Sequence, residues 1–371
     1  MISKSEYLAD VRVRRESEAL AADGHAITVI DATESDLEYR NVTVKGTGRV
    51  SGLGSHRSTT DSIGFRIARW MLLPEHRQRA NSQFQSHVLA RADDLEEMPD
   101  VVHAHDFPAL LPGALLADRF GSKLVYDAHE YWYGLPRYGR PEPVRKRRNR
   151  ATERHLSQKA DRVITVSEGA AALLARDFDL SEISVVRNTF PTHADLDPPD
   201  RPTGVVYAGK ISRGRDLEMV FTSGIWDEGF ELSAMGPQDG SIAVPDHVRV
   251  FPSGPLDDVD KLLSTVGLAI VPLERGPKNH DIALPNKLFQ AVSVGVPVVA
   301  SDLPEIARVV NEYQLGTLYQ SGDRASFARA VGLLVEDYPA YLANVKDARK
   351  ELSWDQDSAR LQSLYASLRL P

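Results

Sequence analysis

The sequence contains no cysteine among its 371 residues. This absence excludes disulfide bonds, thiolate–zinc sites and cysteine nucleophiles, and it fits a protein of the cytoplasm. Long apolar runs are also missing, because the longest, residues 108–117, is far shorter than a membrane span. No basic-then-apolar leader opens the chain. We therefore expect a cytoplasmic protein whose only membrane contact would be peripheral, at the inner membrane face.

An excess of positive charge is lacking as well. Lysine and arginine number 44 against 52 aspartates and glutamates, which gives a net charge of −8. This balance argues against a dedicated nucleic-acid binder. Hydrophobic residues make up 42% of the chain, which is enough for substantial cores, and the length favours two domains over one.

Short runs rich in valine, isoleucine and leucine alternate with stretches of helical periodicity. Strands that are apolar almost throughout are typical of parallel sheets covered on both faces. Their alternation with helices predicts doubly wound α/β domains. The expected strands are residues 26–31, 100–105, 123–129, 161–167, 182–188, 204–209, 230–236, 247–251, 267–273 and 296–301.

A proline-rich segment, residues 190–204, divides these strands into two groups. It holds four prolines and little apolar mass, so we interpret it as the linker between two domains. We predict an N-terminal domain over 1–194, a C-terminal domain over 195–354, and a last helix over 355–371 that packs back on the first domain. The cleft between the carboxyl ends of the two sets of strands is the expected ligand site.

The N-terminus departs from this pattern. Residues 16–30 read as a helix, a turn and a strand, yet no clear strand precedes the helix. Residues 1–15 are too polar to supply a good one. Either the first strand of this sheet is absent from the sequence, or residues 1–3 are its stub.

Basic residues occupy typical phosphate positions in the second half. Lys287 lies in the first turn of a helix that a proline begins, where free N–H groups and a cation together form an anion site. Lys210, Arg213 and Arg215 directly follow the strand expected at 204–209. A solvated basic loop is the alternative for that segment alone. The two segments together predict a phosphate-binding C-terminal domain.

Titratable residues end two neighbouring strands of the first half. His105 and Asp106 close the motif HAHD, and His129 and Glu130 close the motif DAHE. The carboxyl ends of adjacent parallel strands meet at one edge, so these side chains are expected to face the cleft. A histidine there can act as an acid or a base. For any one of these histidines, a structural role beside a carboxylate is the equally open alternative.

A His-x-His pair at a strand end also occurs in barrel metallohydrolases. Such sites need further ligands at later strand ends. The histidines His155, His193, His247 and His280 end no convincing strand. We therefore predict no metal site, and a metallohydrolase stays a remote alternative.

Three weaker patterns carry less weight. Residues 46–54 imitate a glycine-rich dinucleotide loop but miss its spacing, so we expect a mobile loop. Asp-x-Asp triplets at 177–179, 195–197 and 355–357 follow no strand, which argues against a metal-chelating nucleotide-sugar site. The basic run 140–155 is typical of a solvated helix face, and it also offers contact to an anionic membrane or a diphosphate-lipid acceptor.

Taken together, these motifs resemble a retaining glycosyltransferase of family 4 (group 1). That family has the GT-B fold, an α/β architecture in which two Rossmann-like domains with doubly wound parallel sheets face each other across a cleft. The resemblance implies transfer from a nucleotide-diphosphate sugar to a hydroxyl of a sugar, lipid-linked or small-molecule acceptor, without metal or cofactor. It covers nearly the whole chain, through residues 10–30, 100–110, 123–132, 160–168, 185–191, 209–218 and 284–305.

The resemblance also implies a donor site by position. Lys210 and Arg215 match the two basic residues that hold the donor diphosphate, and Arg213 and Lys287 are expected beside them. His129 matches the histidine that lies next to the transferring sugar. The C-terminal domain is therefore expected to bind the phosphates, and the N-terminal domain to present the acceptor.

The rest of the expected site surrounds these groups. His105 is expected to join His129 as a catalytic residue against the sugar or the acceptor. Asp106, Glu130 and Asn188 are expected on the acceptor side, Asn188 as the asparagine of a domain-closing turn.

The nucleotide site departs from the family pattern. Gly209, Gln290 and Glu305 are expected there, and Gln290 stands where the second glutamate of the family's E-x7-E motif binds the ribose. Ile282 stands where the first glutamate should be. An inactive sugar-nucleotide-binding protein is therefore one alternative. A nucleotide-sugar epimerase is another, although the expected C-terminal cleft lacks the carboxylates such enzymes use.

Overall fold

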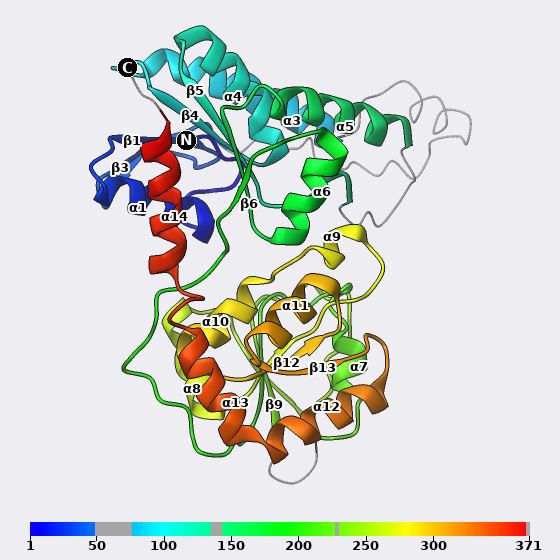
Figure 1. Cartoon of the computed structure of the whole chain (residues 1–371). Coiled ribbons are helices and arrows are strands. Elements are labelled where there is room, and N and C mark those ends of the chain that lie inside the picture. The colour runs from blue at the N-terminus through cyan, green and yellow to red at the C-terminus, as the bar shows by residue number, and fades with distance from the viewer. Residues whose placement is uncertain (49–75, 135–142, 227–229, 369–371) are drawn as a thin grey trace.

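The computed structural model describes residues 1–48, 76–134, 143–226 and 230–368. They fold into two bodies, one above the other in Figure 1, and each is built on a mostly parallel sheet. All ten strands expected from the sequence are present, several of them shorter than expected. The fold is an α/β GT-B architecture of two facing Rossmann-like units.

The sheet of the N-terminal body forms in two parts. One part has the order β1-β3-β2 and the other β4-β5-β6-β7. Every pair is parallel except β2 with β3, a hairpin that the sequence patterns did not predict. Its turn residues, Arg40 and Asn41, both have positive φ, which suits a tight hairpin turn. The strands are β1 (Ile27–Asp31), β2 (Leu37–Tyr39), β3 (Val42–Gly46), β4 (Val101–His105), β5 (Lys123–Ala128), β6 (Arg162–Thr165) and β7 (Ile183–Val185).

Residues 1–3 join the two parts of this sheet. Ile2 forms parallel bridges to both Ile30 of β1 and Ala104 of β4. Its backbone N–H donates to the His103 carbonyl at 2.8 Å, and its carbonyl accepts from the His105 N–H at 3.0 Å. The short segment therefore takes the place of a strand between β1 and β4, as the stub alternative predicted.

Helices of the N-terminal body begin and end at residues with suitable capping chemistry. The Asp10 carboxylate accepts from the Val13 N–H at 3.2 Å, and the Ser167 hydroxyl accepts from the Ala170 N–H at 3.1 Å. Each satisfies a free N–H of a first turn. The helices are α1 (Val11–Ala22), α3 (His76–Arg91), α4 (Asp106–Phe120), α5 (Pro143–Ser157) and α6 (Glu168–Phe178), with 3-10 turns at Ala92–Asp94 and Trp132–Gly134.

The C-terminal body has one six-stranded parallel sheet with the order β10-β9-β8-β11-β12-β13. Alternate residues of each strand enter two separate cores: Val206 packs in one and Val205 in the other. This alternation explains why the strands are apolar almost throughout. The strands are β8 (Gly204–Ala208), β9 (Glu231–Met235), β10 (Val248–Phe251), β11 (Ala269–Val271), β12 (Val298–Ser301) and β13 (Gly316–Tyr319), the last not predicted from the sequence.

The described residues of the C-terminal half form eight helices, and the last of them returns to the N-terminal body. In Figure 1 the red helix α14 lies beside α1, and the Gln362 amide donates to the Ala19 carbonyl at 3.2 Å. No helix within the described ranges is long and apolar enough to cross a membrane. The helices are α7 (Leu217–Phe221), α8 (Leu256–Val266), α9 (Lys278–Asp281), α10 (Asn286–Val294), α11 (Pro304–Glu312), α12 (Arg324–Glu336), α13 (Tyr338–Ala348) and α14 (Trp354–Ser367).

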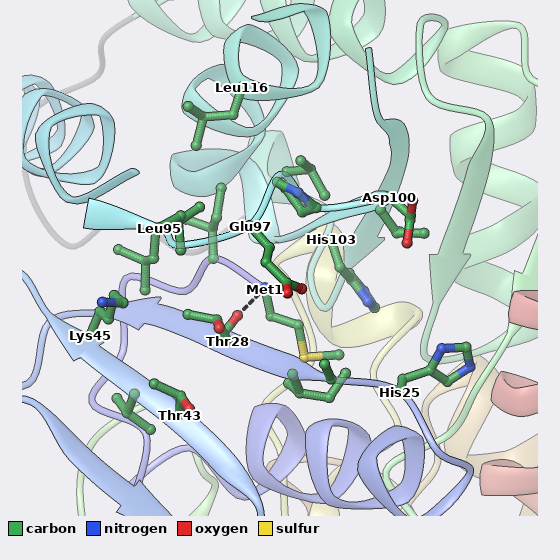
Figure 2. Close-up of a pocket in the computed structure, with 18 of the residues that line it drawn as sticks. Met1, His25, Thr28, Thr43, Lys45, Leu95, Glu97, Asp100, His103 and Leu116 are labelled. Carbon is green, nitrogen blue, oxygen red and sulfur yellow. Dashed lines mark hydrogen bonds between the residues drawn. The ribbon is translucent and has the colours of Figure 1, made fainter. Parts of the chain in front are cut away.

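A cavity of about 860 Å³ lies against the stub, between β1 and β4. Figure 2 shows Met1 inside it, with its amino group donating to the Thr28 carbonyl at 2.6 Å. Burial lowers the pKa of this amino group to about 5. The amine is therefore neutral in the folded protein at pH 7, whereas in the unfolded chain it keeps its usual pKa near 8.

Extending the chain by four β-forming residues before Met1 should stabilise it, and more so at low pH. The unfolded Met1 chain binds a proton below pH 8 that the folded chain binds only below about pH 5. Its stability therefore falls as the pH drops from 8 to 5, by about 3 kcal/mol at pH 5.5. An amide at that position does not titrate. We expect the stability difference between the two chains, from urea unfolding, to grow from pH 8 to pH 5.5; a constant difference would contradict this.

Candidate functional site

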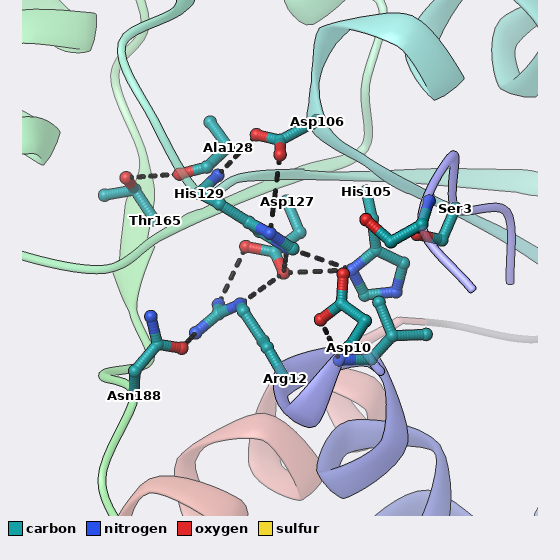
Figure 3. Close-up of polar contacts among 12 residues, drawn as sticks. Ser3, Asp10, Arg12, His105, Asp106, Asp127, Ala128, His129, Thr165 and Asn188 are labelled. Atoms are coloured by element: carbon teal, nitrogen blue, oxygen red, sulfur yellow. Dashed lines mark hydrogen bonds and ion pairs between the residues drawn. The ribbon is translucent and has the colours of Figure 1, made fainter. Parts of the chain in front are cut away.

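Asp127, at the end of β5, is the centre of a buried charge network in the N-terminal body. Its side chain is completely buried, and the Arg12 guanidinium donates a hydrogen bond of 2.8 Å to each carboxylate oxygen (Figure 3). Burial alone would raise the pKa of Asp127, but Arg12 and His129 outweigh it and hold this pKa well below its usual value. Asp127 is therefore a permanent anion at this edge of the sheet.

His129 lies between two carboxylates. Its Nε2 donates to Asp127 Oδ2 at 2.9 Å, and its Nδ1 lies 3.5 Å from Asp106 Oδ2. Burial would lower the pKa of His129, yet Asp106 and Asp127 raise it to about 9. At neutral pH the ring is thus an imidazolium with an anion at each nitrogen. Such a ring stabilises negative charge but has no lone pair with which to act as a base.

His105 lies behind this ion pair. It is 2% exposed, and its Nδ1 lies 3.2 Å from Asp127 Oδ2. Burial lowers its pKa to about 4, so the ring is neutral at pH 7. The enclosed ring lies against Asp127, and its expected catalytic role stays a prediction. Just after the neighbouring strand β5, Glu130 has a pKa raised to about 7 by desolvation and by Asp106.

The His-x-His motif contributes to the one group of metal-ligand type within the described parts of the chain. Candidate ligand atoms of Glu16, His103, His105 and Asp127 all lie within 4.8 Å of one another. Asp127, however, is already bound by the Arg12 fork, which together with the His129 imidazolium places two positive charges beside the group. These charges would repel a divalent cation, so the geometry favours an ion-paired network over a metal site.

Asn188 lies on the same network. Its Oδ1 accepts from Arg12 Nη1 at 2.9 Å, and the same nitrogen donates to the Val186 carbonyl at 2.8 Å. The sequence patterns placed Asn188 in the site but missed Arg12 and Asp127. Asp127 could have been found, because it precedes His129 by two residues on one strand and so shares its face. Nothing in the sequence pairs it with Arg12, which is 115 residues away.

In the C-terminal body, three of the predicted donor residues lie together. Gly209 ends β8 with a φ of +141°, and a Cβ added there would lie 3.7 Å from Lys287 Nζ. Lys287 Nζ lies 4.6 Å from the centre of the Tyr207 ring. Burial and the nearby Arg215 lower the pKa of Lys287 to about 7. Within the described residues, neither Lys287 nor Arg215 forms an ion pair with a carboxylate. Two cations without an anion are what a phosphate site requires.

Lys210 and Arg213 turn to another loop. Lys210 Nζ lies 3.0 Å from Asp239 Oδ2, and Arg213 Nε donates to the Ser241 carbonyl at 3.0 Å. Each of these contacts uses only part of the donor capacity of the side chain, but it directs the cation toward the loop of Asp239 and Ser241. Of the four predicted cations, Lys210 thus pairs with a carboxylate and Arg213 bonds to a backbone carbonyl. Arg215 Nε donates to the Ser212 hydroxyl at 3.2 Å, and neither Arg215 nor Lys287 has a carboxylate partner among the described residues.

Gln290 and Glu305 are both buried. Gln290 is 5% exposed, and its Nε2 donates to Asp260 Oδ1 at 2.9 Å. The Glu305 carboxylate accepts from Arg308 Nη2 at 3.2 Å. The carboxylate also lies against the start of α6, where a Cβ on Gly169 would come within 2.8 Å of Glu305 Oε1. In this arrangement Gln290 bonds to α8, and Glu305 contacts the other body.

The two bodies meet through α9 and the residues next to it. The Ser167 hydroxyl donates to the Ile282 carbonyl at 2.7 Å, and the Tyr131 N–H donates to Asn279 Oδ1 at 3.0 Å. The Ile282 side chain packs against the N-terminal core. The position at which the family carries its first glutamate is thus used here to join the bodies.

The weaker sequence patterns contribute no further site. Asp197 pairs with Lys346, and the buried Asp357 binds Arg187. The basic run forms part of α5 from residue 143 onward, while residues 140–142 lie outside the described residues, as do 49–54 of the glycine-rich segment.

Known proteins resemble this chain along most of its length. The family models "Glycosyltransferase Family 4" and "Glycosyl transferases group 1" match residues 9–193 and 224–337. Glycogen synthase of Mycobacterium tuberculosis is 25% identical, over 95% of this chain and 88% of that protein. D-inositol 3-phosphate glycosyltransferase of Salinispora tropica is 24% identical, over 72% of this chain and 63% of that protein.

Solved structures agree in fold. Sucrose-phosphate synthase from Thermosynechococcus elongatus superposes with a TM-score of 0.73 at 17% identity, covering 99% of this chain and 98% of the other. Anabaena HepE, solved with UDP and glucose, gives 0.70 at 14% identity with the same coverage. The protein is a GT-B glycosyltransferase. In this glycosyltransferase the two bodies of Figure 1 are the two domains of that fold.

Replacing Gln290 by glutamate should destabilise the glycosyltransferase. The new carboxylate would lie beside buried Asp260, whose pKa burial already raises, and the hydrogen bond between them would be lost. We expect a loss of roughly 1–3 kcal/mol in unfolding free energy at pH 7, from urea denaturation. Glutamate at Gln356, an exposed residue of α14, is the control.

Nucleotide affinity of the same variant separates packing from ribose binding. Because the Gln290 amide bonds to α8, we expect UDP affinity per folded molecule to stay within twofold, by calorimetry. Tighter UDP binding with unchanged stability would instead place Gln290 at the ribose.

Proposed function

We propose that this glycosyltransferase is a retaining enzyme that moves a sugar from a nucleotide-diphosphate sugar to an acceptor hydroxyl without a metal ion. The observation that carries the proposal is the unpaired cation pair, Arg215 and Lys287, beside Gly209 at the carboxyl end of β8. Structural neighbours solved with UDP or UDP-glucose support a nucleotide-sugar donor. The product would be a glycan or glycoconjugate, as the names of the curated relatives suggest.

The donor diphosphate binds to the C-terminal domain in this proposal. Lys287 lies in the first turn of α10, and no side chain caps that helix start, so its N–H groups also face the anion. Arg215 supplies a second charge-assisted hydrogen bond. Around these cations the described residues form no group of metal-ligand type, which suits charge neutralisation by lysine and arginine.

The N-terminal domain stabilises the transition state. As the bond from sugar to phosphate breaks, negative charge develops on the diphosphate, and the His129 imidazolium and Arg215 are suited to stabilise it. The acceptor hydroxyl attacks from the side of the departing phosphate, whose oxygen takes the hydroxyl proton, and this retains the sugar configuration. Contacts such as Ser167 to Ile282 close the domains and exclude water that would hydrolyse the donor.

The acceptor side is open to several chemistries. Asp106 and Glu130 offer carboxylates to sugar hydroxyls near His129. Helix α5 carries arginines and a lysine in the sequence PVRKRRNR, which suits an anionic membrane surface or a lipid-linked diphosphate. Peripheral membrane contact through this helix is therefore part of the proposal.

A titration with UDP-, GDP- and ADP-sugars tests the donor site. Lys287→Ala and Arg215→Ala should each weaken binding of the preferred donor by roughly 1.5–3 kcal/mol, the scale of a charge-assisted hydrogen bond. Lys350→Ala, which removes an exposed lysine of the same domain, is the control. Transfer should persist in EDTA, and NMR of the product should show a retained anomeric configuration. Unchanged affinity in the double variant, or activity that needs added zinc, would contradict the proposal.

Donor binding should also take up a proton at pH 8. With a pKa of about 7, Lys287 is mostly neutral in the free protein at that pH, and a bound diphosphate favours its charged form. Calorimetry in buffers of different ionisation enthalpy should report up to about 0.9 proton bound per UDP-glucose. The uptake should vanish in Lys287→Ala and remain in Lys350→Ala.

A further inference from the structure

Arg12, in the first turn of α1, uses its guanidinium to join two parts of the chain that are far apart in sequence. It is 7% exposed and binds both oxygens of Asp127 at 2.8 Å. It also donates to the Val186 carbonyl at 2.8 Å and to Asn188 Oδ1 at 2.9 Å. Figure 3 shows it between Asn188 on one side and the Asp127–His129 pair on the other. Its planar group makes all four contacts at once, a geometry that lysine cannot reproduce.

Residues 186–189, which we call the strap, leave β7 and lead to the second domain. Alternate residues of the strap contact two different partners, Arg12 of α1 and Asp357 of α14. Val186 and Asn188 contact Arg12, whereas the Thr189 hydroxyl donates to Asp357 Oδ2 at 2.7 Å and Arg187 Nε lies 3.1 Å from the same oxygen. Asp357 belongs to α14, the helix that brings the chain back from the second domain.

Both crossings between the domains meet at this place. Next to the strap, the Trp354 N–H at the start of α14 donates to the Phe190 carbonyl at 3.0 Å. Rotation of one domain against the other must change the backbone here, because the two domains are linked covalently only through these segments. A change in the strap therefore reaches Arg12 directly through Val186 and Asn188.

We propose that Arg12 is a positioning residue that couples the strap, and hence domain closure, to the orientation of His129 through Asp127. Arg12 is buried and acts through Asp127. It holds the carboxylate to which His129 Nε2 donates at 2.9 Å, so the direction of the imidazolium depends on where the guanidinium lies. The link to catalysis rests on the proposed function, whereas the coupling itself does not.

A packing role alone would not explain this arrangement. Apolar residues of similar volume often replace buried ion pairs without loss of stability, so a buried arginine is not required to fill the space. Arg12 instead directs its donors to Asp127, which orients His129, and to two strap groups, and its Nε also lies 3.0 Å from Glu16 Oε1 on its own helix. The planar guanidinium therefore links Asp127 rigidly to the Val186 carbonyl and the Asn188 amide.

The test uses Arg12→Lys, which keeps the charge and loses the fork, and Asn188→Ala, which removes one strap contact. Arg14→Ala is the control, because Arg14 lies on the same helix but faces Glu18 and the Leu8 carbonyl. We expect Arg12→Lys to lower kcat at least thirtyfold while the UDP dissociation constant stays within twofold. Asn188→Ala should lower kcat several-fold in the parent protein and cause no further loss in the Arg12→Lys background. Guanidinium ion should partly restore kcat in Arg12→Ala.

NMR of the His129 ring tests the coupling between the strap and His129 without any sugar transfer. With ring-labelled histidine, and the His129 signal assigned from His129→Gln, Asn188→Ala should shift the His129 signal in the parent protein. It should leave that signal unmoved in Arg12→Lys, and Arg14→Ala should leave the parent signal in place.

Three outcomes would contradict the coupling. They are full kcat in Arg12→Lys, additive effects of Arg12→Lys and Asn188→Ala on kcat, and a His129 signal that Asn188→Ala does not shift in the parent protein. If no variant nor the parent transfers sugar while UDP binds, the proposed function fails, and the NMR result still decides the coupling. An Arg12→Ala chain that does not fold leaves the lysine and Asn188 variants to give the answer.

Discussion

The charge of Asp127, completely buried at the end of β5, is the constraint on which the N-terminal half of the site depends. A carboxylate removed from water must be neutralised and hydrogen-bonded, or it is protonated. Arg12 satisfies it from α1, and His129 satisfies it from the bend directly after β5. In return, Asp127 and Asp106 keep His129 protonated. One buried anion thereby fixes the helix, the strand end and the charge that faces a substrate.

The C-terminal half uses the opposite strategy. Arg215 and Lys287 lie together with no carboxylate to balance them among the described residues, and burial with mutual repulsion lowers the pKa of Lys287 to about 7. Such a pair is incomplete without an anion. The charges of the N-terminal network balance one another, whereas the C-terminal cations need an anionic ligand for balance. This difference suits a donor that binds to the C-terminal domain first, with the N-terminal domain then completing the site.

Position 282 shows how a departure from a family pattern acquires a structural use. Where the resemblance expected a glutamate for the sugar, Ile282 packs against the N-terminal core, and its carbonyl accepts from Ser167. An apolar side chain at a domain contact favours the closed arrangement through burial. Glutamate in the same place would put a charge there. Position 282 can thus hold a carboxylate for the sugar or an apolar side chain for the domain contact, and only the structure of both domains shows which of the two this chain has.

The sequence by itself determined the two sets of strands, the polar motifs at their carboxyl ends and the cations after β8 and in the first turn of α10. These are local features, because apolar runs, turn residues and helix starts are encoded within a few neighbouring positions. It did not reveal the hairpin of β2 and β3, whose strands are short and partly polar, nor Arg12, whose partner lies 115 residues away. The sequence also could not tell which of the predicted cations contact a carboxylate or a carbonyl of the protein. Lys210 and Arg213 are held by Asp239 and Ser241, and Gln290 by Asp260. Such pairings depend on which segments the tertiary structure brings within hydrogen-bond distance, and only the folded chain decides them.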